Sequence, residues 1–219
     1  MLIVGARGFA KEVLEVVSQL NELMDLVFYD DVNRNLPAKL YGKFPVLTSL
    51  DEASAYFIHT DSRFTLGLGN PYLRKKMYEK FLAAGGQLVS TISPLACIGS
   101  FDVQIGEGSN ILPGAIFSNG TKIGRGGIVY YHSSITHDCI IGEFVQISPG
   151  VTLLGKSEVG SYSQIGANAT ILPNVKIGQN VIIGAGAVVT KDIPDDCLVT
   201  GIPGIIKKKL TPLDIEYDG

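Results

Sequence analysis

The chain has 219 residues, 46% of them hydrophobic and only 18% charged, with a net charge of −3; this composition supports a folded core and argues against a coiled coil, a disordered chain and a nucleic-acid-binding protein with a basic surface. The three cysteines lack CxxC spacing, which argues against a disulfide framework and against a zinc knuckle. We find no signal-peptide pattern and no apolar run of membrane-spanning length, so we expect a soluble, cytoplasmic protein without membrane insertion.

The first part of the chain, residues 1–89, alternates predicted strands with predicted helices. The expected strands are residues 2–4, 26–29 and 64–68, and the expected helices are residues 9–23 and 71–84. Strands that alternate with helices imply a small parallel sheet, so we expect a Rossmann-like α/β domain here.

Two loops of this domain carry candidate ligand contacts. The loop Gly5-Ala6-Arg7-Gly8 lacks the full GxGxxG pattern, but it lies between a strand and a helix, where backbone N–H groups favour an anion. Asp30-Asp31 end the second strand, where hydrogen bonds from a ribose or a base are often accepted. A simple turn is the alternative interpretation of the two aspartates.

The second part of the chain has a period of six. All fifteen residues in steps of six from Ile105 to Val189 are apolar, which for one fixed frame has a chance on the order of 10⁻⁵. The residue four positions after each of them is nearly always small or β-branched. This hexapeptide repeat predicts a parallel β-helix, with three hexads in each triangular coil of about 18 residues and about five coils in all. We expect it to occupy residues 90–205 and to be followed by a C-terminal tail, residues 206–219.

The length of a coil predicts which residues stack. His137 should lie near a corner, between Asn119 of the previous coil and Gly155 of the next, and Asp138 should lie beside Lys156. A glycine next to the histidine leaves an open notch and exposes a backbone N–H group. Because a single prism has few concave surfaces, we expect ligand pockets where prisms meet or where the first domain contacts the prism.

The two parts together resemble the NeuD/PglD-like sugar acyltransferases, which have a small nucleotide-binding domain followed by a left-handed β-helix. The matching stretches are residues 3–10, 28–31, 67–70, 74–76, 135–144 and 199–203. The motif His137-Asp138-Cys139-x-Ile141-Gly142, together with the N-terminal domain, is the most specific part of the resemblance. The resemblance implies a nucleotide-sugar-binding domain in residues 1–89, an acyltransferase domain in residues 90–205, and a homotrimer with three equal clefts.

The resemblance also implies an activity. Members of the family transfer an acetyl group from acetyl-CoA to a sugar, with no metal; the acceptor is the 4-amino group of a nucleotide-linked 4-amino-4,6-dideoxy sugar in one branch and a hydroxyl of sialic acid in another. We expect the first reaction, in surface glycan biosynthesis, and keep sugar or serine O-acetylation as the alternative. The sequence does not name the nucleotide, which can be UDP, GDP or dTDP.

Site residues follow from the matched motifs. By this resemblance His137 is the general base, and Asp138 is the neighbour that raises its basicity. The positions that match contacts to the sugar nucleotide are Arg7, Gly8, Phe9, Asp30, Asp31 and Gly69, and those that match contacts to acetyl-CoA are Gln146, Gly155 and Ala167. Gln146 departs from the family, where a second histidine is common, and Arg7 and Phe9 replace a common Ser and His.

The residue types suit the chemistry. A neutral imidazole, with an ordinary pKa of about 6.5, can take a proton from the acceptor at physiological pH. We therefore expect direct transfer in a ternary complex, with the N–H of Gly155 as an oxyanion donor. The alternatives are a surface histidine at position 137 and, for Asp138, a surface pair with Lys156, since neighbouring residues on a strand face apart.

Two other classes of function remain open at this stage. A γ-class carbonic anhydrase uses the same prism with three histidine ligands, and His132 and His137 have the spacing of two of them, but His59 lies in the other domain. A non-catalytic β-solenoid is the second. Residues 207–209, three lysines, are either a solvated tail or a contact to the phosphates of coenzyme A.

Overall fold

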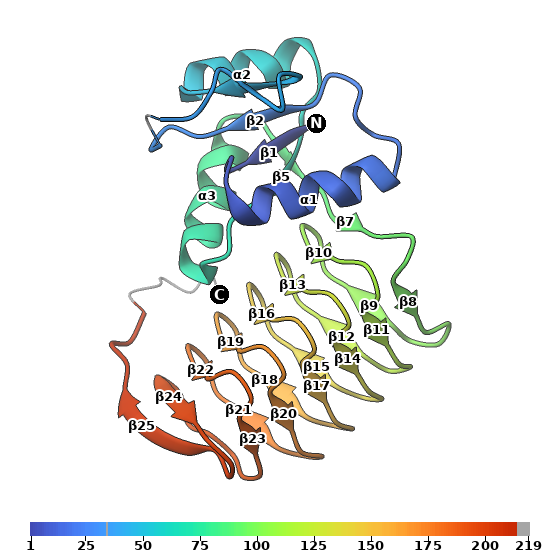
Figure 1. The fold of residues 1–219 in the computed structure, drawn as a ribbon, viewed down its shortest axis with the longest axis vertical. Coiled ribbons are helices and arrows are strands. Elements are labelled where there is room, and N and C mark those ends of the chain that lie inside the picture. The colour runs from blue at the N-terminus through green and yellow to red at the C-terminus, as the bar shows by residue number, and fades with distance from the viewer. Residues whose placement is uncertain (34, 214–219) are drawn as a thin grey trace.

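The computed structural model describes residues 1–33 and 35–213. It contains a small α/β domain that lies on one face of a long prism of stacked coils (Figure 1). The predicted order, an α/β domain followed by a parallel β-helix, is confirmed.

The α/β domain is built around one sheet with strand order β3-β4-β2-β1-β5-β6. Its strands are β1 (Leu2–Val4), β2 (Val27–Tyr29), β3 (Lys39–Leu40), β4 (Phe44–Leu47), β5 (Arg63–Leu66) and β6 (Gln87–Leu88), and its helices are α1 (Gly8–Gln19), α2 (Leu50–His59) and α3 (Pro71–Ala83). All neighbouring strands are parallel except β3 and β4. The strands β1, β2 and β5 are buried almost throughout, as expected for a sheet covered on both faces.

Local sequence explains where the helices begin. The Asn70 side chain accepts a hydrogen bond from the amide of Leu73 at 2.9 Å, and Pro71 occupies the first turn of α3, where its missing N–H costs nothing. The helix α2 was not among the predicted elements. Its signal is a capping box, in which Ser49 and Glu52 bond to each other's backbone amides.

The prism has three faces made of short parallel strands. The docking face, which carries the α/β domain, consists of β7 (Thr91–Ile92), β10 (Asn110–Ile111), β13 (Ile128–Val129), β16 (Gln146–Ile147), β19 (Gln164–Ile165), β22 (Ile182–Ile183), β24 (Cys197–Thr200) and β25 (Ile205–Lys209). The second face consists of β8 (Cys97–Ile98), β11 (Ile116–Phe117), β14 (Ser134–Ile135), β17 (Thr152–Leu153), β20 (Thr170–Ile171) and β23 (Val188–Val189). The third consists of β9 (Gln104–Ile105), β12 (Lys122–Ile123), β15 (Ile140–Ile141), β18 (Glu158–Val159) and β21 (Lys176–Ile177).

The repeat positions form the core of this prism. Within the regular coils, paired strands are 18 residues apart, as for Ile135 and Leu153. Fourteen of the fifteen predicted inward residues are buried, and Ile105, near the open end, is partly buried. Burying an aliphatic side chain of this size contributes about 1.5–3 kcal/mol, so the stack of these residues stabilises the fold along its whole length.

The C-terminal part differs from the prediction. Residues 206–209, expected to belong to a tail, lie in β25, which pairs antiparallel with β24 and closes the end of the docking face. All five residues of β25 are exposed. Residues 214–219 of the predicted tail lie outside the described part of the chain.

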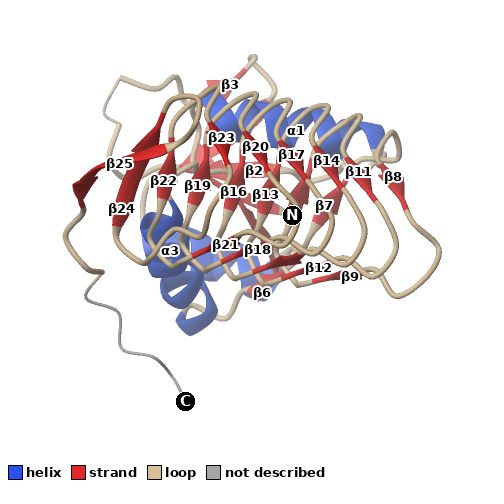
Figure 2. Ribbon diagram, turned by 90° about the horizontal axis from the view of Figure 1, so that it is seen from below, coloured by secondary structure: helices blue, strands red, loops and turns tan. Residues whose placement is uncertain are grey.

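The α/β domain covers the early coils of the docking face. Asn110, whose side chain points out of the prism, is fully buried there: its amide donates to the carbonyl of Leu66 at 3.0 Å, and Thr65 donates to its side-chain oxygen at 3.1 Å. The corner between the second and third faces, here called the outer edge, lies on the side away from this domain and faces the viewer in Figure 2.

Candidate active site

The motif histidine lies on the outer edge, between β14 and β15. Asp138 adopts φ = +60° at this corner, so its side chain turns back toward the preceding residue. His137 Nδ1 and Asp138 Oδ2 are 2.9 Å apart, and the two side chains are 61% and 54% exposed. The predicted alternative, a pair between Asp138 and Lys156, does not form within the described residues.

Glycines on both sides make room for this pair, in agreement with the predicted stacking. A Cβ atom on Gly155 would lie 2.5 Å from Nε2 of His137, so the imidazole ring lies directly over the glycine. A Cβ atom on Gly120, one coil before Asp138, would lie 2.5 Å from Oδ1 of Asp138.

This geometry assigns the two nitrogens of the imidazole. When Nδ1 donates its proton to the carboxylate of Asp138, the lone pair of Nε2 is left free over Gly155. The amide of Gly155 donates to no acceptor within residues 1–33 and 35–213. A basic nitrogen and a free N–H group therefore lie side by side at the outer edge.

A second candidate region lies at the carboxyl ends of β1 and β2. A cavity of about 590 Å³ opens there between the sheet and α3, with Val4, Leu68 and Met77 among its apolar lining residues. Asp31 and Lys80 supply charges at its wall. An apolar cavity with a few polar groups at the ends of parallel strands is a usual place for a nucleotide.

The two charged side chains Asp31 and Lys80 form an ion pair at the wall of this cavity. Asp31 accepts hydrogen bonds from Nζ of Lys80 at 2.9 Å and from the hydroxyl of Tyr29 at 2.8 Å. Burial raises the pKa of the Asp31 carboxyl, but these two donors outweigh burial and lower the pKa overall. Burial lowers the pKa of Lys80, and its bonds to Asp31 and Tyr29 outweigh this and raise it. The pair is therefore ionised over the whole neutral range.

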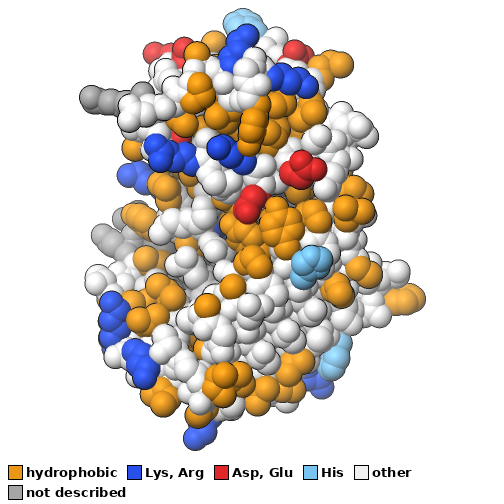
Figure 3. Space-filling model, in the orientation of Figure 1, with side chains coloured by type: hydrophobic (Ala, Val, Ile, Leu, Met, Phe, Trp, Pro, Cys, Tyr) orange, Lys and Arg blue, Asp and Glu red, His pale blue; other side chains and the backbone are white. Residues whose placement is uncertain are grey.

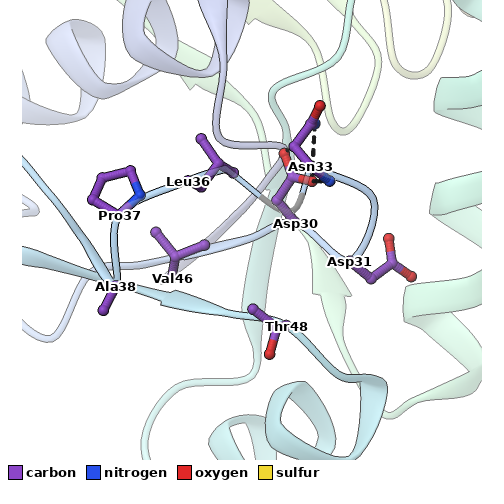
Figure 4. Close-up of a pocket in the computed structure, with 8 residues that line it drawn as sticks. All are labelled: Asp30, Asp31, Asn33, Leu36, Pro37, Ala38, Val46 and Thr48. Atoms are coloured by element: carbon purple, nitrogen blue, oxygen red, sulfur yellow. Dashed lines mark hydrogen bonds between the residues drawn. The ribbon is translucent and has the colours of Figure 1, made fainter.

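Asp30 has a different role from Asp31. Its Oδ1 atom accepts from the amides of Val32 and Asn33 at 3.2 and 2.9 Å, and the Asn33 side chain bonds both carboxylate oxygens. In Figure 4 Asp30 faces Asn33, whereas Asp31 points away from this turn. Asp30 thus shapes the turn after β2, between the large cavity and a smaller one of about 170 Å³ that Leu36, Pro37 and Thr48 help to line.

The other predicted substrate contacts lie near the interface between the two domains. Arg7 and Gly8, at the start of α1, are exposed, and the ring of Phe9 lies 5.2 Å from that of Tyr130 of the prism. Figure 3 shows acidic and hydrophobic side chains gathered on this face where the domains meet. Gly69 lies beside the prism: a Cβ atom on it would be 3.7 Å from Oε1 of Gln146.

The structure separates the predicted site residues into two groups. His137, Asp138 and Gly155 lie on the outer edge of the prism. The remaining residues lie on the α/β domain or along the docking face, with Gln146 in β16 and Ala167 just after β19. Within one protomer the basic nitrogen therefore does not reach the cavity, because the body of the prism lies between them (Figure 2).

Several cavity residues were missed by the sequence analysis. Lys76 and Lys80 both line the cavity, from successive turns of α3, as do Leu73 and Met77. The sequence does contain a pattern that could have identified them: these four positions are spaced by three and four residues, which places them on one face of a helix. Tyr29 was read only as part of a strand, although it directly precedes the two aspartates.

The histidines do not converge as a metal site would require. His132 and His137 lie at successive corners of one coil, on either side of β14. Within the described part of the chain, no three His, Cys, Asp or Glu side chains gather closely enough to hold a metal ion. None of the helices described is long and apolar enough to cross a membrane.

Comparison with known proteins gives consistent matches over both domains. The PglD N-terminal domain family matches residues 1–81, and the family described as bacterial transferase hexapeptide (six repeats) matches residues 138–172 and 156–191. The chain is 31% identical to the GDP-perosamine N-acetyltransferase of Escherichia coli O157:H7 over 159 residues. The aligned region covers 70% of this chain and 69% of that protein.

Solved structures agree over nearly the whole chain. PerB from Caulobacter crescentus, in complex with CoA and GDP-perosamine, is 30% identical with a TM-score of 0.85, covering 94% of this chain and 96% of that one. The acetyltransferase domain of PglB from Neisseria gonorrhoeae FA1090 is 31% identical with a TM-score of 0.83, covering 94% of this chain and 98% of that one.

Proposed function

Because the chain belongs to the NeuD/PglD-like family of sugar acyltransferases, we propose that it transfers an acetyl group from acetyl-CoA to the 4-amino group of a nucleotide-linked 4-amino-4,6-dideoxy sugar. The acetylated sugar nucleotide then serves in the biosynthesis of a surface glycan. One observation carries the proposal: an imidazole whose Nδ1 is bonded to Asp138 and whose Nε2 is free over Gly155.

The reaction is a direct transfer. The amine nitrogen of the acceptor attacks the thioester carbonyl carbon, and Nε2 of His137 takes the proton that the nitrogen loses. Asp138 holds the ring in the tautomer that this step needs. The free N–H of Gly155 donates to the oxygen of the tetrahedral intermediate. When the carbon–sulfur bond breaks, the imidazolium returns its proton to the departing thiolate of coenzyme A.

The substrates occupy the two groups of residues. The nucleotide lies in the large cavity beside Asp31 and Lys80, and the loop of Arg7, Gly8 and Phe9 contacts its phosphates, since a guanidinium and a helix N-terminus both suit phosphate oxygens. Asp30 supports the same site by holding the turn after β2. The sugar then extends past Gly69 toward the prism. Gln146 and Ala167 line the docking face, where acetyl-CoA lies.

A complete site then requires a second copy of the chain. We propose a homotrimer with parallel prisms, in which the outer edge of one protomer faces the docking face and nucleotide cavity of the next. The separation of the two residue groups supports this arrangement, since neither group alone contains both the base and the acceptor site. The high exposure of His137 and Asp138 in the single protomer agrees with an edge that a neighbour covers.

A thiol-release assay tests the activity. Purified protein is mixed with acetyl-CoA and a panel of UDP-, GDP- and dTDP-linked 4-amino sugars, with sialic acid and serine as hydroxyl acceptors. We expect turnover with at least one amino sugar nucleotide. We expect a His137→Ala variant to keep its oligomeric state and to lose most of the turnover. Release of coenzyme A only with a hydroxyl acceptor, or near-normal turnover of the variant, would contradict the proposal.

A further inference from the structure

Arg74 is a fully buried arginine without an acidic partner. It lies in the first turns of α3, its side chain has no exposed surface, and burial lowers its pKa to about 9. Among the residues described, no carboxylate pairs with it. Its donors bond only to backbone carbonyls: those of Gly69, Gly126, Phe144 and Val145. A buried charge held in this way is unusual and needs a reason.

The four carbonyls belong to two parts of the proposed site. Gly69 lies in the loop after β5, which leads from the nucleotide cavity to the prism. The other three belong to corners of the docking face, and Val145 directly precedes Gln146. The guanidinium bonds to Gly126 at 3.1 Å and to Val145 at 3.2 Å, and also to Gly69. One rigid group therefore fixes the Gly69 loop against the strand that carries Gln146.

Aromatic contacts hold the same helix at the same corner. Tyr78, one turn after Arg74, lies 6.0 Å from the ring of Phe144 and 5.1 Å from the guanidinium of Arg125. The ring of Phe144 in turn stacks on Tyr162 at 5.8 Å with an interplanar angle of 8°. The helix can therefore neither rotate nor slide on the prism without losing several contacts at once.

The competing explanation is that Arg74 only stabilises the contact between the two domains. The interface contains a second polar cluster with which Arg74 can be compared. The cluster of Thr65, Thr91 and Asn110 also joins the two domains through buried hydrogen bonds. That cluster contacts the strand β5 and its last carbonyl, that of Leu66, but not Gly69. Arg74 differs because it bonds directly to the loop beside Gln146.

We propose that Arg74 is a positioning residue for acetyl transfer, which sets the distance between the loop that holds the nucleotide-linked sugar and the prism that holds acetyl-CoA. The inference rests on the proposed function. Arg74 touches neither substrate, so each half of the site should bind its own ligand without it. What it supplies is the alignment of the amine with the thioester, and a misplacement of about 1 Å can cost about 10²-fold in rate.

The test separates binding from alignment. In Arg74→Gln we expect kcat for the amino sugar nucleotide to fall about 10²-fold, while the dissociation constants of the free nucleoside diphosphate and of coenzyme A stay within about twofold. In Arg74→Lys we expect a fall of about tenfold, because one ammonium cannot serve four carbonyls arranged for a planar fork. The matched control is Thr65→Val, which weakens the other interdomain cluster and should lower the melting temperature without changing kcat.

Three outcomes would overturn the inference: wild-type kcat in both Arg74 variants, an equal fall of kcat in Thr65→Val, or a loss of nucleotide affinity that accounts for the fall. If neither Arg74 variant folds, Tyr78→Ala loosens the same helix at the same corner and should lower kcat about tenfold with both affinities retained; unchanged kcat there contradicts the inference. Absence of turnover in the wild-type protein would instead contradict the proposed function.

Discussion

Substituting Gly155 by alanine tests the geometry of the base without removing it. The new Cβ atom would lie 2.5 Å from Nε2 and 2.6 Å from Cε1 of His137, well inside contact distance. The backbone at Gly155 is outside the left-handed region, so alanine adds no backbone strain and the clash with the imidazole is the only cost. The imidazole is 61% exposed and free to turn away, and in doing so it leaves Asp138 and the free N–H group.

The expected magnitudes follow from that displacement. A side chain driven off its preferred rotamer costs about 0.5–1.5 kcal/mol, so the melting temperature should fall by no more than about 6 °C. Turnover should fall about 10²-fold or more, because a positioned general base typically contributes 10²–10⁴-fold. Thermal unfolding and the thiol-release assay measure the two effects on the same sample.

The chain offers a matched control for this substitution. In Gly114→Ala the new Cβ atom would lie 2.6 Å from Nδ1 of His132, so the clash with a histidine is the same but occurs at another corner. Gly114 has φ = +75°, which adds a cost of about 1–2 kcal/mol for alanine. We expect this variant to be less stable and fully active. A Gly155→Ala variant with turnover within threefold of wild type would refute the reasoning about His137.

Three further outcomes are expected. Asp138→Asn should lower kcat about 10- to 100-fold with unchanged stability, because it removes the acceptor that fixes the tautomer of His137; steady-state kinetics and thermal unfolding check this. Lys80→Met should weaken binding of a nucleoside diphosphate about tenfold by calorimetry, whereas equal affinity would separate Lys80 from the nucleotide. Asp61 is partly desolvated, but its bonds to Arg63 and to the N-terminal ammonium hold its pKa far below the ordinary value of 3.8. Its contribution to stability is therefore fully present above about pH 5, so the difference in melting temperature between wild type and Asp61→Asn should be constant there, and it should shrink steadily as pH falls below 3.8.

The architecture could be predicted because each hexad repeats one physical requirement. A coil of the prism stays closed only if a large aliphatic residue points inward on every face, so the period of six is visible in the sequence from Ile105 to Val189. The same regularity correctly placed His137 over Gly155. The strand β25 was not foreseen, because its residues Ile205–Lys209 are outside the repeat and pair antiparallel.

The details of the site were harder to predict. Neighbouring residues on a strand face apart, which favoured the alternative interpretation of Asp138, but Asp138 occupies a left-handed corner that brings its side chain and that of His137 together. Lys80 and Asp31 meet across the cavity although 49 residues separate them, and no local pattern links a helix to a strand so far away. Gln146 follows His137 by nine residues, which is half a coil. That spacing was sufficient to place the two on opposite sides of the prism.

The central claim is that the site is completed between protomers, with the base from one and the acceptor cavity from the next. Mixed trimers of His137→Ala and Leu73→Trp, the latter filling the cavity of about 590 Å³, test this directly. Each parent should be inactive, and random assembly of equal amounts should restore about a quarter of wild-type activity, because about one interface in four combines an intact edge with an intact cavity. Mixtures that remain as inactive as their parents, although they exchange subunits, would contradict the account.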